Sequence, residues 1–108
     1  MKLLTAELRR QLPKLYSTEE TKLEDKIVYA KYFTPWGSYT AWLMEGEEEG
    51  DDFIFFGFAS GVPYPEFGTF SLKEFESVRG FGNLGIERDL GFTKRKVSEI
   101  PEIMKHIL

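Results

Sequence analysis

The chain of 108 residues is 42% hydrophobic and 16% aromatic, a composition typical of a globular domain with one core and not of a disordered chain. It contains no cysteine, which excludes disulfides, thiolate zinc sites, iron–sulfur clusters and a cysteine nucleophile. The net charge of −4 is unevenly placed, since residues 45–66 hold seven acidic residues and no lysine or arginine.

The N-terminal residues lack the pattern of a signal peptide. Glu7, Arg9 and Arg10 interrupt the first turns before an apolar core of the usual length can form. No run of about 18 apolar residues occurs in the sequence. We therefore expect a cytoplasmic protein without membrane contact, folded as a single domain over residues 1–108.

The first predicted element is a short helix with leucines on one side. Thr5 is expected to cap its start, and Pro13 to end it, because proline cannot continue a helix. The leucines are spaced by four, four and three residues and would rest on a sheet: Leu4, Leu8, Leu12 and Leu15. Residues 17–26 are polar and are predicted to form a surface connection.

Three segments are rich in β-branched and aromatic residues and predict strands: residues 26–33, 38–44 and 52–58. Pro35 and Gly37 place a turn between the first two, which predicts an antiparallel hairpin. The acidic run 45–52 is predicted to be a loop that returns the chain for the third strand. Both faces of that third strand are apolar, so we expect it to lie inside the sheet.

The second half of the chain predicts two more helices. Residues 61–68 read as irregular, and residues 69–70 as a short strand. Ser71 and Glu74 have the spacing of a capping box at a helix start, and Gly80 is expected to end that helix in the left-handed conformation. Ser98 is expected to cap a closing helix. The predicted fold class is α+β, with an antiparallel sheet of four or five strands and three short flanking helices.

Three glycines and one histidine are the residues that most suggest a cofactor. Gly80, Gly82 and Gly85 match a phosphate-cradling pattern, but they follow a helix, which is the reverse of the order in which that motif works. Helix termination and a tight turn explain them better. His106, the only histidine, lies near the end of the last predicted helix, where the helix dipole favours an imidazolium. We therefore predict no cofactor and no metal site of the usual type.

Two carboxylates in the segment 86–89 leave two interpretations open. If the segment is extended, Glu87 and Asp89 share one face at a separation of roughly 6–7 Å, and such a pair can hold a divalent cation or divide acid and base roles. The favoured alternative is structural: Glu87 or Asp89 would pair with Arg79, and Arg88 with Glu74 or Glu76. The predicted structural network is Ser71, Glu74, Gly80, Glu87 and Asp89.

Aromatic residues in predicted loops are candidates for partner binding, because irregular segments lie on the surface and aromatic side chains anchor interfaces. Together with two arginines they form the candidate protein-binding set: Trp36, Tyr64, Phe81, Arg79 and Arg88. Lys94, Arg95 and Lys96 form a basic cluster that could contact nucleic acid. The acidic segment 45–52 leaves open a third role, as a mimic of DNA that occupies a basic groove.

Several stretches resemble a small family of bacterial, plasmid and phage proteins catalogued as a domain of unknown function, number 2958. The resemblance spans roughly residues 1–100 and rests on the stretches "VYAKYFTPWGSYTAWLMEGE", "GTFSLKEFESVRG" and "LGIERDLGF". It brings no activity, cofactor or catalytic residue, and implies an accessory protein of a mobile genetic element. We expect a non-enzymatic module that binds a protein of the element or host; the alternative is a nucleic-acid-associated protein or metal-dependent enzyme using Glu87 and Asp89.

Overall fold

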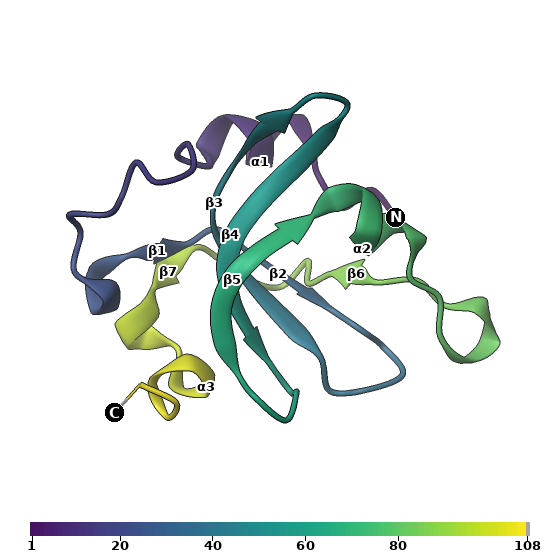
Figure 1. The fold of residues 1–108 in the computed structure, drawn as a ribbon. Helices are drawn as coiled ribbons and strands as arrows, with labels where there is room; N and C mark the ends of the chain where they lie inside the picture. The colour runs from purple at the N-terminus through teal and green to yellow at the C-terminus, as the bar shows by residue number, and fades with distance from the viewer. Residues whose placement is uncertain (108) are drawn as a thin grey trace.

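A five-stranded antiparallel sheet organises the computed structural model, which describes residues 1–107 (Figure 1). The strand order is β5-β4-β3-β2-β6. These strands are β2 (Ala30–Phe33), β3 (Thr40–Glu49), β4 (Asp52–Ser60), β5 (Glu66–Ser71) and β6 (Glu87–Arg88). A second, two-stranded sheet pairs β1 (Ile27–Val28) with β7 (Arg95–Lys96). The helices are α1 (Ala6–Gln11), α2 (Leu72–Ser77) and α3 (Pro101–Met104). The predicted α+β class is confirmed.

Hydrophobic residues pack on both faces of the large sheet. On one face, Leu8 of α1 and Phe75 of α2 pack in one cluster with Tyr32 and Phe55 of the strands. On the other, the C-terminal segment with α3 contributes Ile103 against Phe58. β4 lies between β3 and β5, with Phe55 on one face and Phe58 on the other, both fully buried. Its predicted place inside the sheet is confirmed.

The N-terminal helix forms as its local sequence dictates. The hydroxyl of Thr5 accepts a hydrogen bond from the backbone N–H of Leu8 at 3.1 Å, which satisfies one of the free donors at the helix start. The helix stops at Leu12, whose ψ of 124° is extended, directly before Pro13. Leu8 and Leu12 are buried against the sheet. Both predicted boundaries are confirmed.

The acidic segment is not the loop that its charge predicts. β3 continues to Glu49, and β4 starts at Asp52 after a tight turn in which Gly50 has a φ of +62°. A β-bulge between Leu43 and Glu45 shifts the register in the middle of the strand. The bulge lies next to Glu45, whose side chain is buried. A buried carboxylate needs hydrogen-bond donors, and Tyr16, far earlier in the chain, supplies one of them.

Other strand boundaries also differ from the sequence prediction. The predicted strand 26–33 divides between two sheets, because β1 pairs with β7 and β2 pairs with β3. β5 begins at Glu66, inside the segment predicted to be irregular, and pairs with β4 without interruption as far as Ser71. Six consecutive residues of β5 pair with β4, so the strand is longer than the two residues, 69–70, that the sequence predicts.

The ends of the later helices require two corrections. Gly80 does not end α2 in the left-handed conformation: the helix ends at Ser77, and Gly80 is extended with a φ of −116°. Ser98 does not cap the last helix, because Val97–Glu99 form a separate 3-10 turn and α3 starts at Pro101, a residue suited to the first helical position. No helix within residues 1–107 has the length and hydrophobicity needed to cross a bilayer.

Candidate protein-binding surface

A closed loop connects α2 to β6 and extends from the sheet (residues 78–86; Figure 1, right). Its base is an antiparallel bridge between Arg79 and Gly85. Inside it, the Gly80 N–H donates to the Leu84 carbonyl at 2.8 Å. Phe81–Asn83 form a 3-10 turn in which Gly82 has a φ of +69°, a conformation that favours glycine. The glycines therefore build a turn, as predicted.

Trp36 supports this loop from the β2–β3 hairpin. A Cβ placed on Gly80 would lie 2.1 Å from the indole ring of Trp36, so only glycine permits the contact. The tryptophan is half-buried and packs against the core on the α1 and α2 side of the sheet. Trp36, a member of the candidate protein-binding set, thus lies beneath the loop and holds Gly80 in place; its contact with a partner stays a prediction.

The arginines of the candidate set bind backbone carbonyls. Nη1 of Arg79 donates to the carbonyls of Glu76 and Val78, each at 2.7 Å, and so covers free acceptors at the end of α2. Arg88 donates to the carbonyl of Lys2 at 3.3 and 3.4 Å. The sequence predicts that these two arginines pair with carboxylates, and this prediction is wrong. Their guanidinium groups bind backbone carbonyls instead, at the end of α2 and near the N-terminus.

The tip of the loop carries an exposed apolar group. Phe81 is 86% exposed, and Val78 and Leu84 at the two sides of the loop are also exposed. Large apolar side chains this accessible on an ordered loop are typical of binding surfaces. Tyr64 is 84% exposed as well, but it belongs to the turn between β4 and β5, at another end of the molecule (Figure 1, bottom).

An apolar cavity of about 290 Å³ lies between α2, β5 and the β2–β3 hairpin. Val78, the first residue of the loop, lines the cavity, whereas Phe81 and Leu84 lie further along the loop. Partial burial raises the pKa of the Tyr39 hydroxyl above its ordinary value. We call the exposed residues and this cavity the α2 surface. Its members are Val78, Phe81 and Leu84 with the cavity residues Thr34, Tyr39, Thr69, Phe70, Ser71, Glu74, Phe75 and Ile86.

Sequence reasoning missed the cavity half of the α2 surface. Tyr39, Phe70 and Phe75 come from a hairpin, an edge strand and a helix, and only the fold brings them together. The one local signal was Val78, which continues the apolar spacing of α2 yet lies beyond the last helical residue. Because Val78 lies just past the end of the helix, its side chain is not packed within α2 and lines the cavity.

Glu87 and Asp89 line two different cavities. Glu87 lies in a polar cavity of about 420 Å³ with Glu76 and Arg79. Asp89 lies in the groove between α1 and residues 88–94 and forms an ion pair with Lys31 at 3.6 Å. Within residues 1–107 no three acidic or histidine side chains converge as metal ligands would. The structure thus gives each of these carboxylates a separate environment.

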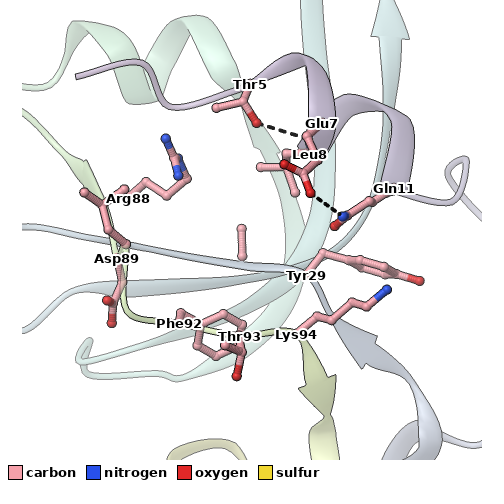
Figure 2. Close-up of a pocket in the computed structure, with 12 residues that line it drawn as sticks. Thr5, Glu7, Leu8, Gln11, Tyr29, Arg88, Asp89, Phe92, Thr93 and Lys94 are labelled. Carbon is pink, nitrogen blue, oxygen red and sulfur yellow. Dashed lines mark hydrogen bonds between the residues drawn. The ribbon is translucent and has the colours of Figure 1, made fainter.

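The basic cluster Lys94–Lys96 lies beside the groove that holds Asp89. Lys94 lines the groove of about 310 Å³, whose opposite end holds Arg88 (Figure 2). The guanidinium of Arg95 lies 5.0 Å from the ring centre of Phe92 and donates to Thr93. Lys96 lies 3.8 Å from Asp25. Lys94 and the residues that Arg95 contacts line one groove, whereas Lys96 lies beside Asp25; contact of these residues with nucleic acid stays a prediction.

The acidic segment is used within the fold. Glu45 accepts the N–H groups of Tyr16 at 2.7 Å and Thr18 at 3.2 Å, and Glu47 accepts the N–H of Leu15 at 2.9 Å. Further acidic residues have partners on the helices: Glu48 with Arg9, Asp51 with Lys73, and Asp52 with Ser71 and the Lys73 N–H. These contacts bury Glu45, whereas Glu48 and Asp51 keep exposed side chains, so the role as a mimic of DNA stays a prediction.

Ser71 and Asp52 together cap α2. The Ser71 hydroxyl accepts the N–H of Glu74 at 3.2 Å, as predicted, while it donates to Asp52. Asp52 also accepts the N–H of Lys73 at 3.1 Å. The Ser71 hydrogen bond and other donors hold the pKa of Asp52 below its ordinary value. The cap fixes the helix that forms one wall of the α2 surface.

The structure therefore defines an antiparallel α+β domain that carries an exposed apolar loop with a cavity beside it. The chain belongs to the family described as "Protein of unknown function (DUF2958)", whose model matches residues 3–105. No curated protein matches the chain, and no solved structure matches it.

Proposed function

We propose that this protein is a small protein-binding accessory module that docks on its partner through the α2 surface. The observation that carries the proposal is the Phe81 side chain, 86% exposed at the tip of a closed loop. An aromatic ring in this position contributes a large apolar area when it becomes buried. The binding role follows from this exposure and from the cavity beside it.

The loop is ordered before a partner arrives. The bridge between Arg79 and Gly85, the hydrogen bond from Gly80 to Leu84 and the packing of Trp36 under Gly80 all hold its backbone. Binding to a preformed loop loses little conformational entropy, so more of the interaction energy of Phe81 appears as affinity. A specific interface buries roughly 800 Å² on each partner, which a domain of this size can supply.

The partner is proposed to be a protein of a mobile genetic element or of its host. This part of the proposal rests on the resemblance of the sequence to a family found on plasmids and phages. We assign the protein no catalytic step: Glu87 and Asp89, the pair that the sequence offers for one, line separate cavities.

The proposal is tested by purifying the tagged full chain from cells of its source, with Phe81→Asp and Leu90→Asp compared in parallel. Leu90 is also an exposed apolar residue, but it lies outside the α2 surface. We expect a stoichiometric protein that the wild type and Leu90→Asp retain and Phe81→Asp loses. The purified pair should then bind directly, with Kd raised at least about tenfold by Phe81→Asp, as for an interface hot spot. Equal retention by all three proteins would contradict the proposal.

A further inference from the structure

The outer edge of β5 is an unpaired strand edge. β5 is the terminal strand of the five-stranded sheet, and β4 is its only strand partner within residues 1–107. Proteins usually protect such an edge with bulges, lysines or prolines inside the strand. β5 has an unbroken register with β4, and its one charge is Glu66 at the start. Within residues 1–107 the side of β5 that faces away from β4 has no strand partner, so its backbone groups can pair with another extended chain.

The apolar cavity of the α2 surface opens beside this edge. Thr69, Phe70 and Ser71 of β5 line it together with Phe75 of α2. Side chains alternate along a strand, so Gly68 lies on the same face as Phe70. A Cβ placed on Gly68 would have nothing within 4 Å, which leaves open space on that face. A strand added to β5 would therefore find room for one large side chain over Gly68 and into the cavity.

The wall of the cavity carries one negative charge. Glu74 lines the cavity, whereas Glu66, on the same face of β5 as Phe70, lies four residues away along the strand, at roughly 13 Å. Glu74 forms no ion pair within residues 1–107, whereas the neighbouring Lys73 pairs with Asp51. A lysine or arginine close to the apolar side chain of an incoming strand would complement Glu74.

We propose that an extended segment of the partner protein adds to the edge of β5 and inserts an aromatic or large aliphatic side chain into the cavity, with a basic residue nearby. Backbone hydrogen bonds would supply affinity, and the cavity would supply specificity, as in other cases of β-strand addition. The inference rests on the proposed function and names the form in which the partner binds.

A second copy of this chain does not fit the cavity in the same way. Of the two terminal strands of the large sheet, β6 has only two residues, so the longer strand edge of a second copy is β5, whose aromatic residues are occupied in their own chain. The ring of Phe67 packs 4.7 Å from Phe58, and that of Phe70 stacks 5.5 Å from Phe75, measured between centroids. Pairing two β5 strands would leave the cavity without an apolar side chain, so the occupant is assigned to a different protein.

The test uses a phage-displayed library of random 12-residue peptides selected on the immobilised full chain. We expect enriched peptides that share a large apolar residue and a lysine or arginine. The strongest peptide is then synthesised in two forms, each N-methylated on alternate residues. One form should lose at least about tenfold in affinity, because methylation removes the donors of the edge, and the other should bind nearly unchanged.

Two variants separate the cavity from the rest of the surface. Val78→Arg places a bulky cation at the cavity wall and should weaken the peptide at least about tenfold, whereas Leu90→Arg, at an exposed apolar residue elsewhere, should not. Matching melting temperatures would show that both variants fold. Failure to enrich such peptides, or binding unaffected by both methylated forms and by Val78→Arg, would overturn strand addition.

Two other outcomes are distinguishable from these. Concentration-dependent dimers whose NMR shift changes map to β5 would reassign the edge to a second copy. If Phe81→Asp releases the natural partner while Val78→Arg retains it, the proposed function stands and the strand-addition inference falls.

Discussion

The indole ring of Trp36 packs directly against Gly80 and leaves no room for a side-chain carbon on this residue. A Cβ on Gly80 would be 2.1 Å from the indole ring, and the φ of −116° at this glycine is one that any residue can adopt. The requirement for glycine is therefore steric and not conformational. It links the β2–β3 hairpin to the loop that carries Phe81, so the position of the exposed ring depends on a contact between distant parts of the chain.

Replacing Gly80 by alanine should destabilise the protein by about 1–3 kcal/mol, the usual cost of overpacking. The double variant Gly80→Ala, Trp36→Ala should be more stable than the sum of the single changes predicts, because the clash is removed. Urea denaturation of the four proteins in this cycle measures the coupling. Additive effects would show that Gly80 and Trp36 do not constrain each other.

Glu45→Ala should cost about 2–4 kcal/mol, since it leaves the N–H groups of Tyr16 and Thr18 without their acceptor in a part-buried site. Glu45 itself is only 3% exposed. Glu45→Gln keeps one oxygen acceptor and should cost less. Glu49→Gln, at an exposed position of the same strand, should stay within about 0.5 kcal/mol of the wild type. Equal losses for Glu45→Ala and Glu49→Gln in denaturation experiments would refute this role of the Glu45 hydrogen bonds.

Asp52 should contribute to a loss of stability in acid. Its folded pKa is below the ordinary value of 3.8, chiefly because Ser71 donates to the carboxylate, so the unfolded chain binds a proton first. The contribution is present above the unfolded pKa and is lost as the pH falls through the folded one. Melting temperature measured from pH 6 to pH 2 should therefore fall less steeply below about pH 3.8 in Asp52→Asn than in the wild type. Parallel curves would argue against this cap.

Arg79→Ala should destabilise the protein by only about 0.5–1.5 kcal/mol, because the guanidinium is exposed and binds two carbonyls that water can also reach. An ion pair with Glu87 or Asp89 would instead make the cost depend on salt. The check is chemical denaturation of the wild type and Arg79→Ala at low and high ionic strength. A difference that shrinks markedly in salt would favour the carboxylate pairing over the observed one.

Elements that depend on neighbouring residues could be predicted from the sequence. Thr5 and Pro13 bound α1, Ser71 caps α2, and the two apolar faces of β4 place it inside the sheet. In each case the residue and its effect lie within a few positions of each other, so the sequence contains the whole cause.

Features that depend on distant partners could not be predicted. β3 continues through its acidic half because Tyr16 and Thr18, almost thirty residues earlier, supply donors to Glu45. Gly80 is needed for Trp36, and the cavity combines three elements that are separate in the sequence. The loop position of Phe81 was predictable, but not its exposure or the support beneath it.

The most direct measurement is the affinity of the purified partner for the wild type and for Phe81→Asp, with the melting temperature of both proteins recorded. Since Phe81 is 86% exposed, Phe81→Asp should leave the melting temperature unchanged and raise Kd at least about tenfold. Unchanged affinity at unchanged stability would show that the α2 surface does not bind the partner.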